Sequence, residues 1–189
     1  MFKRIFIKSY LITDPLYYGN TRNKLLEILN HTLRVNKPNY VCFRDKSSKN
    51  YEELAKIFVD TCKNNKTENI LLNQEYLLAH KLEAHGVHLT SKQFNHIKEA
   101  KALNLFVIIS CHTEEDIKKA IILKADAVSY SPIFDTPNKG KNKGIEELIR
   151  ICNTYEIKVF ALGGIITKEH LQEIKKSKAY GFASIRYFI

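Results

Sequence analysis

The chain has 189 residues and a formal net charge of +10, and 44% of its residues are hydrophobic and 11% aromatic. This length and composition suit one globular domain with a sizeable core and exclude a disordered chain. No apolar stretch has membrane-spanning length, and the first residues do not have the pattern of a signal peptide.

The positive charge comes mostly from scattered lysines, without the aromatic residues that accompany them in a nucleic-acid-binding groove. We therefore expect neither a nucleic acid nor a membrane as partner. The cysteines show no CxxC pair and no zinc-ligand spacing, which favours a reducing, cytoplasmic compartment. They are Cys42, Cys62, Cys111 and Cys152.

Short apolar runs predict eight β-strands along the chain. The runs are Tyr10–Thr13, Tyr40–Phe43, Ile70–Leu72, Gly86–His88, Leu105–Ile109, Ala127–Tyr130, Lys158–Leu162 and Ala179–Phe182. Between them, apolar residues at helical spacing predict amphipathic helices. These stripes are Leu25–Leu33, Leu54–Cys62, Ile97–Leu103, Ile117–Ala125, Ile145–Cys152 and Leu171–Ile174. This alternation is typical of a parallel sheet with helical crossovers.

Eight such units predict a small TIM (β/α)8 barrel, an α/β fold in which residues 1–189 form a single domain. The sequence ends at Ile189, so the eighth helix is truncated to a turn or two. Residues 1–8 are expected to be an N-terminal extension, as an added strand or a plug over the barrel floor. The alternative is a doubly wound open sheet, which would place a glycine-rich turn after its first strand. Here Gly163 and Gly164 follow the seventh strand, which favours the barrel.

Polar or glycine-rich clusters directly follow the predicted strands. They are Asp14, Arg44–Lys46, Asn73–Gln74, Leu89–Ser91, Ser110–His112, Ser131–Pro132 and Gly163–Gly164. In a parallel barrel these positions collect in one ring at the carboxyl ends of the strands, where such barrels do their chemistry. The spacing therefore predicts an active-site face as well as a fold.

Two of these turns predict a phosphate site. Gly163 and Gly164 allow the backbone to approach a ligand and to present N–H groups, and the loops after strands seven and eight often bind phosphate in barrels. Gly181, Ala183 and Ser184 would supply the second half, with a short helix opening at Ser184 and directing its N–H groups at the anion. The alternative is a pair of tight turns without a ligand.

Other polar side chains are candidate ligand contacts. The proline-stiffened loop after the sixth strand can hold Thr136 and Lys139 over the phosphate. Arg44 is suited to a bidentate contact with a carboxylate or phosphate, with Lys46 beside it. The alternative for Arg44 is an ion pair with Asp45 in solvent.

His112, at the end of the fifth strand, is the candidate general acid/base because imidazole titrates near neutral pH. The alternative is a histidine that only caps or packs the start of a helix. Most other histidines lie on predicted helices or loops. His88 lies inside a strand, where it is expected to pack or to orient a neighbour.

Eight segments also carry a family resemblance. They are Tyr10–Asp14, Phe43–Lys46, Leu71–Asn73, Gly86–Leu89, Ser110–Glu115, Ser131–Thr136, Leu162–Ile165 and Gly181–Ala183. Taken in this order, they resemble the thiamine phosphate synthase/TenI family over nearly the whole chain. The resemblance implies a TIM barrel that handles a phosphorylated thiazole, with Asn73 and Ser110 among its substrate-binding residues.

Family synthases join a pyrimidine diphosphate to thiazole phosphate and release pyrophosphate with Mg²⁺, which aspartates hold. This chain has Gln74 and Gln93 at the usual aspartate positions. Neutral amide oxygens are weaker partners than carboxylates for this hard cation. Glu75 should point away from the ring if Gln74 points into it. The sequence therefore predicts no metal site and no cofactor.

The other activity that the resemblance implies is that of thiazole tautomerase, which moves a proton on a carboxythiazole phosphate without a metal. The family's acid/base histidine corresponds to His112, while Arg44 and Lys46 would hold the substrate carboxylate. The sequence thus favours a metal-independent isomerase in thiamine biosynthesis. The alternatives are a Mg²⁺-dependent thiamine phosphate synthase and a non-catalytic, thiazole-phosphate-binding regulatory protein.

Three features have open roles. Arg186 falls where the family often has a small serine, so it either adds a phosphate cation or blocks the pocket. The apolar tail 185–189 either covers the missing helix or meets a second subunit in a homodimer. The lysine-rich segment 138–144 looks like a mobile basic loop.

Overall fold

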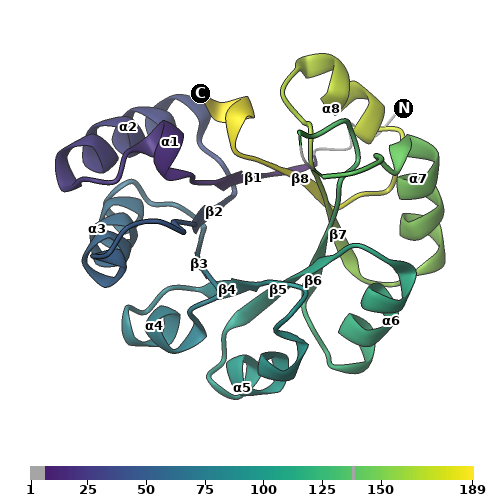
Figure 1. The fold of residues 1–189 in the computed structure, drawn as a ribbon, viewed down its shortest axis with the longest axis horizontal. Coiled ribbons are helices and arrows are strands. Elements are labelled where there is room, and N and C mark those ends of the chain that lie inside the picture. The colour runs from purple at the N-terminus through teal and green to yellow at the C-terminus, as the bar shows by residue number, and fades with distance from the viewer. Residues whose placement is uncertain (1–6, 138) are drawn as a thin grey trace.

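The computed structural model describes residues 7–137 and 139–189. Its parallel strands pair in chain order and close into a barrel, because the last strand also pairs with the first (Figure 1). The strands are β1 (Lys8–Ile12), β2 (Tyr40–Phe43), β3 (Asn69–Asn73), β4 (Gly86–Leu89), β5 (Phe106–Cys111), β6 (Ala127–Tyr130), β7 (Lys158–Leu162) and β8 (Gly181–Ser184). The predicted TIM barrel is confirmed, and the doubly wound sheet is excluded.

Helices surround the barrel (Figure 1). They are α1 (Pro15–Tyr18), α2 (Arg22–Asn36), α3 (Tyr51–Asn64), α4 (Tyr76–Lys81), α5 (Ile97–Ala102), α6 (Glu114–Ile122), α7 (Gly144–Thr154) and α8 (Lys168–Ile174), with 3-10 turns η1 (Phe94–His96) and η2 (Arg186–Phe188). After β8, the residues up to Ile189 contain the single turn η2, in agreement with the short eighth helix that the sequence predicts. Within the described ranges, no helix has the length and apolar character needed to cross a membrane.

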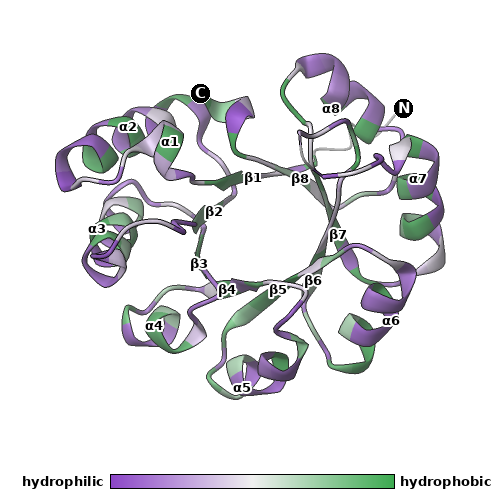
Figure 2. Cartoon of the chain, in the orientation of Figure 1, coloured by the Kyte–Doolittle hydropathy of each residue, from purple (hydrophilic) through white to green (hydrophobic). Residues whose placement is uncertain are grey.

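Strand side chains alternate between two cores. One core lies between the strands and the helices and includes Leu11, Val41 and Ile109. The other fills the barrel interior, where the ring of Phe160 packs edge-on against Tyr10 and Tyr40 with centroids 5.2 and 5.1 Å apart. Figure 2 shows hydrophobic and hydrophilic residues alternating around the helices, as expected when one face packs on the strands. The interior of the barrel is therefore filled by side chains and is not an open channel.

The register of the first and last strands differs from the sequence prediction. Lys8 is already part of β1 and pairs with Gly181, the first residue of β8. Only Ile7 and Lys8 of the expected extension are described, and residues 1–6 lie outside the described ranges. The sequence predicted the eighth strand over Ala179–Phe182, whereas β8 begins two residues later, at Gly181. The apolar run started early because it included Ala179 and the aromatic residue Tyr180, which precede the strand.

This register corrects the expected role of Gly181. The residue lies at the amino end of β8, on the opposite side of the barrel from the ring. A Cβ atom there would lie 2.4 Å from the Lys8 carbonyl oxygen and 2.7 Å from the Phe160 ring. Glycine is therefore required for close packing, and the prediction that Gly181 binds phosphate is wrong.

Candidate active site

The carboxyl ends of the strands bring most of the predicted site residues to one rim of the barrel. Each lies at, or within a few residues of, the last residue of its strand. They are Asp14 after β1, Arg44 and Lys46 after β2, Asn73 at the end of β3, Ser110 and His112 around the end of β5, Ser131 after β6, Gly163 and Gly164 after β7, and Ala183 and Ser184 at the end of β8.

Arg44 pairs with Asp14, and not with Asp45 as one sequence interpretation suggested. Its Nη1 donates to Asp14 Oδ2 at 2.6 Å, and both side chains are about three-quarters buried, with exposed fractions of 25% and 27%. Thr13 holds the Arg44 backbone, since its Oγ1 accepts from Arg44 N at 2.9 Å. The pairing of β1 with β2 brings these residues together, and Asp14 is the site residue whose role the sequence did not show.

Asp45 is bound locally instead. Its carboxylate accepts hydrogen bonds from the backbone N–H groups of Ser47 and Ser48 and from both hydroxyl groups. Burial acts to raise its pKa, but the hydrogen bonds from Ser48 and Ser47 outweigh it and lower the pKa of Asp45 below its ordinary value. The Asp45 carboxylate is therefore an anchor for the turn after β2.

Lys46 lies in a positive environment made by two loops. The charge of Arg44, then desolvation, then the charge of Lys139 lower the pKa of Lys46 below its ordinary value. Lys139 comes from the loop after β6, so the long loop brings its cation toward the end of β2. Beside Arg44 and Lys46 lies an open groove of about 800 Å³, whose lining has three cations, with Lys24 as the third, and the two carboxylates of Asp14 and Glu27. This arrangement favours an anionic ligand.

Gly163 and Gly164 allow the loop after β6 to pack on the end of β7. Their φ angles are +99° and +68°, a region that favours glycine. A Cβ on Gly163 would lie 2.8 Å from Pro132 Cα and 3.2 Å from Thr136 Oγ1. The N–H groups of the two glycines have no hydrogen-bond acceptor among residues 7–137 and 139–189. They are therefore available to a ligand, with Thr136 next to them.

The end of β8 differs from the prediction. Ser184 is a buried strand residue, and its Oγ donates to Ile165 O at 2.6 Å and accepts from Tyr187 N at 3.2 Å. No helix opens at Ser184, because the following η2 begins at Arg186 and is a single 3-10 turn. The predicted helix N-terminus at Ser184 is wrong. Ala183 pairs with Leu162, so the end of β8 still lies next to the paired glycines.

His112 is exposed on the ring with one ring nitrogen bound. Its Nδ1 lies 3.1 Å from the Ser131 carbonyl oxygen, which can only accept, so Nδ1 carries the proton and Nε2 is left as a hydrogen-bond acceptor. The main chain of His112 is fixed as well, since its N–H donates to Asp116 Oδ2 at 2.8 Å. Thr113 and Asp116 form the capping box of α6. An accessible Nε2 on a fixed turn suits proton transfer.

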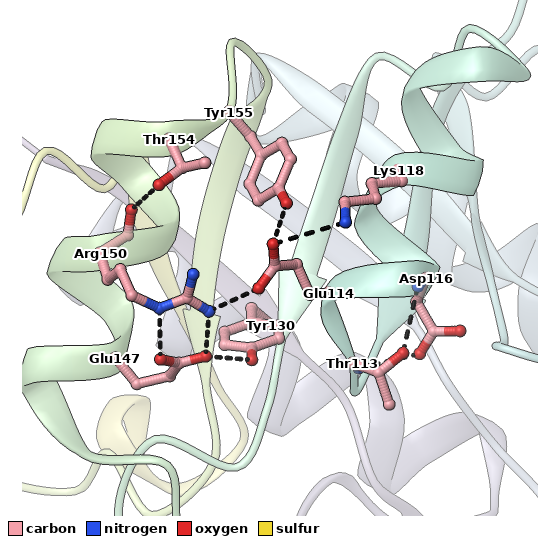
Figure 3. Close-up of polar contacts among 9 residues, drawn as sticks. All are labelled: Thr113, Glu114, Asp116, Lys118, Tyr130, Glu147, Arg150, Thr154 and Tyr155. Atoms are coloured by element: carbon pink, nitrogen blue, oxygen red, sulfur yellow. Dashed lines mark hydrogen bonds and ion pairs between the residues drawn. The ribbon is translucent and has the colours of Figure 1, made fainter.

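An ion-pair cluster of Glu114, Arg150 and Glu147 stands behind this turn and joins α6 to α7 (Figure 3). Arg150 binds Glu114 at 2.7 Å and Glu147 at 2.9 Å. Tyr155 and Tyr130 donate to the two carboxylates. The hydrogen bonds from Tyr155 and Arg150 lower the pKa of Glu114 to about 2. Because Glu114 follows His112 by two residues, the cluster helps to hold the His112 turn against α7.

The residues at the family's metal position do not fit Mg²⁺. Gln93 Oε1 already accepts from the Thr90 N–H and hydroxyl groups at 3.1 Å, and its Nε2 donates to Gln74 O at 3.4 Å. Gln74 Nε2 donates to Asn73 Oδ1. Glu75 is exposed. In the part of the chain that is described, no group of three or more His, Cys, Asp or Glu residues is placed to hold a metal ion. Hard cations prefer carboxylate oxygens, so this neutral amide set is a poor magnesium site.

The fold and the ring define a TIM-barrel protein with the cations Arg44 and Lys46 at the carboxyl ends of its strands. The chain belongs to the thiamine monophosphate synthase family, whose model matches residues 9–188. It is 34% identical over 189 residues to a protein of Aquifex aeolicus named putative thiamine-phosphate synthase 2, covering 96% of this chain and 97% of that one. A thiamine-phosphate synthase of Pelagibacter ubique is 29% identical over 170 residues, covering 84% and 82% of the two chains.

Solved structures agree on the fold. A thiamine phosphate pyrophosphorylase from Pyrococcus furiosus superimposes with a TM-score of 0.80 at 24% identity, covering 95% of this chain and 85% of that one. A structure titled native KDPGal gives a TM-score of 0.76 at 16% identity, covering 97% and 85%. At these identities the likeness is evidence of the barrel and not of a shared reaction.

Proposed function

We propose that this protein is a thiamine-phosphate synthase that binds thiazole phosphate on the ring and joins it to a pyrimidine diphosphate. The observation that carries this proposal is the group of cations Arg44, Lys46 and Lys139 near the carboxyl ends of the strands, in a chain that the family model matches over residues 9–188. The relative from Aquifex aeolicus, which is named putative thiamine-phosphate synthase 2 and is matched over 97% of its length, supports the same reaction.

Two groups on the ring have separate roles in this reaction: the N–H groups after β7 and the cations after β2. The free N–H groups of Gly163 and Gly164, with Thr136 beside them, bind the phosphate of the thiazole. Arg44, held by Asp14, and Lys46 bind the diphosphate and stabilise the negative charge that the departing pyrophosphate carries. No step is assigned to a metal, because Gln74 and Gln93 do not provide carboxylates.

A second candidate is the thiazole tautomerase reaction, and one observation favours it. His112 is exposed on the same rim as the neutral amides of Gln74 and Gln93, and its Nδ1 is bound to Ser131 O, which suits proton transfer by Nε2 without a metal. In that reaction Arg44 and Lys46 would bind the substrate carboxylate.

Two assays on the purified protein separate the candidates. The first measures thiamine phosphate formed from pyrimidine diphosphate and thiazole phosphate, with Mg²⁺ and with EDTA. The second follows isomerisation of the carboxythiazole phosphate under the same conditions. Condensation supports the synthase, and isomerisation without condensation supports the tautomerase. Thermal stabilisation by thiazole phosphate without either turnover would indicate a non-catalytic binding protein and contradict both.

A further inference from the structure

A chain of hydrogen-bonded polar side chains lies in the barrel interior and links β1, β4, β5 and β6. This His88 chain consists of Tyr10, His88, Ser129 and Ser110. The Tyr10 hydroxyl lies 2.8 Å from His88 Nδ1. On the other side of the imidazole, Nε2 lies 3.0 Å from Ser129 Oγ and 3.2 Å from Ser110 Oγ. Tyr10 and Ser129 are 0% exposed and His88 is 3% exposed. Ser110, at the end of β5, is the member that is partly exposed and lies nearest the ring.

This imidazole is neutral at physiological pH. Burial, and to a smaller extent the charge of Arg44, lower the pKa of His88 to about 4. A neutral imidazole has one N–H donor and one acceptor nitrogen, and their assignment follows from the hydrogen bonds that each nitrogen makes. Its interior location also keeps it out of direct contact with a ligand on the ring.

The contacts select one tautomer. If Nδ1 is the acceptor, the Tyr10 hydroxyl donates to it and Nε2 carries the proton. The opposite tautomer would turn the buried Tyr10 proton away from this nitrogen, toward the weakly accepting sulfur of Cys42. Leaving a buried donor poorly paired costs about 1–3 kcal/mol, so the arrangement with the proton on Nε2 is favoured.

This tautomer determines what Ser110 can do. With its proton on Nε2, His88 donates toward the oxygens of Ser129 and Ser110, and Ser129 Oγ lies 3.5 Å from Ser110 Oγ with the geometry of a donor. The oxygen of Ser110 is then an acceptor within the barrel, so its own proton is free to point out toward the ring. In the other tautomer Nε2 would accept from one of the two serine hydroxyls, at 3.0 or 3.2 Å, instead of donating to their oxygens.

We propose that Tyr10 and His88 are positioning residues that fix the Ser110 hydroxyl as a hydrogen-bond donor to the ligand on the ring. The identity of that ligand, thiazole phosphate, rests on the proposed function. The arrangement of the three side chains rests on the barrel interior alone. Ser110 touches the ligand, while Tyr10 and His88 act through it.

A double-mutant cycle tests this coupling. Tyr10→Phe removes one hydroxyl without changing the packing volume, and Ser110→Ala removes the proposed donor. We expect Tyr10→Phe to weaken thiazole phosphate binding by about threefold to tenfold, the range of one net hydrogen bond. In the Ser110→Ala protein the same change should have no further effect, because Tyr10 acts through Ser110.

Tyr40→Phe is the matched control. Tyr40 is also a buried tyrosine of the barrel interior, and its ring packs edge-on against Tyr10 with centroids 5.9 Å apart, but its hydroxyl pairs with the Tyr180 hydroxyl at 3.1 Å. We expect it to leave the affinity unchanged. An equal loss of affinity in Tyr10→Phe and Tyr40→Phe, or an effect of Tyr10→Phe that persists without Ser110, would overturn the positioning role.

Nitrogen-15 NMR of the histidine rings gives a readout that does not depend on a ligand. We expect His88 to carry its proton on Nε2 between about pH 5 and 8 in wild-type protein, and to lose this preference in Tyr10→Phe. A proton on Nδ1 in the wild type would overturn the inference. Failure of the wild type to bind thiazole phosphate, with the NMR result as expected, would instead overturn the proposed function and the ligand contact of Ser110.

Discussion

The Nδ1 atom of His112 lies 3.1 Å from the carbonyl oxygen of Ser131, so the end of β6 fixes the side chain that follows β5. For the tautomerase candidate, we expect His112→Ala to lower isomerisation of the carboxythiazole phosphate by about 10²–10⁴-fold, the usual contribution of a positioned acid/base. The affinity for thiazole phosphate should stay within about twofold. Single-turnover kinetics and calorimetry measure the two quantities, and isomerisation at the wild-type rate would remove His112 from this role.

The paired glycines give a prediction about stability. Gly163→Ala places a Cβ against Pro132 in a left-handed backbone conformation, so we expect a loss of about 2 kcal/mol or more in the free energy of unfolding. Gly144→Ala is the control, since its φ is +77° but nothing lies within 4 Å of the added Cβ. It should cost only about 1 kcal/mol. Urea unfolding measures both, and equal losses would contradict the close packing of the loop.

The cationic side of the ring predicts salt-dependent binding. Removing the charge in Lys46→Met should weaken pyrophosphate binding by about tenfold to a hundredfold, as loss of a charge-assisted hydrogen bond requires. Lys56→Met, an exposed change on α3, is the control. Calorimetry at about 50 and 200 mM salt should show a weaker salt dependence for the Lys46 variant than for the other two proteins. Similar affinities for both variants would contradict a diphosphate site at Lys46.

Replacing the amides of Gln74 and Gln93 by carboxylates is expected to create a Mg²⁺ site. Gln74→Asp combined with Gln93→Asp supplies two carboxylates, so we expect measurable Mg²⁺ binding by calorimetry where the wild type shows little. Gln172→Asp, an exposed change on α8, controls for a single negative charge added away from the two positions. If the double variant binds Mg²⁺ no better than this control, the two positions do not face a common ion.

Burial of His88 predicts a pH dependence of stability. Its pKa falls from an ordinary 6.5 to about 4 in the folded protein, so the unfolded chain binds the proton more tightly. The contribution of neutral His88 to the free energy of unfolding is complete above pH 6.5. It is lost progressively as the pH falls toward 4, and the total loss is about 3 kcal/mol. Urea unfolding of the wild type should show this additional loss relative to His88→Gln. Parallel pH profiles of the two proteins would contradict a buried neutral His88.

The periodicity of the chain predicted the barrel and most of the ring, because strand ends follow directly from where each apolar run stops. The register between neighbouring strands could not be predicted from the sequence in the same way. Gly181 and Ser184 lie within the same strand β8, and the position of Gly181 depends on its pairing with Lys8. A glycine that prevents a clash with a neighbouring strand cannot be distinguished in sequence from one that approaches a ligand.

The sequence also did not predict which residues far apart in the chain contact each other. Asp45 is adjacent to Arg44 in sequence, yet the salt bridge forms with Asp14, 30 residues earlier. The pairing of β1 with β2 places those two side chains together, whereas the local turn satisfies Asp45 through Ser47 and Ser48. The polar chain through His88 depends similarly on four strands whose interior faces meet only in the closed barrel.

The central claim is that the ring at the carboxyl ends of the strands binds a phosphorylated thiazole, and a crystal structure with thiazole phosphate tests it most directly. We expect the phosphate to lie within hydrogen-bond distance of the N–H groups of Gly163 and Gly164, with the thiazole extending toward Ser110. A phosphate bound at the opposite end of the barrel, near Gly181, or a ligand that leaves these N–H groups unbound, would contradict the account.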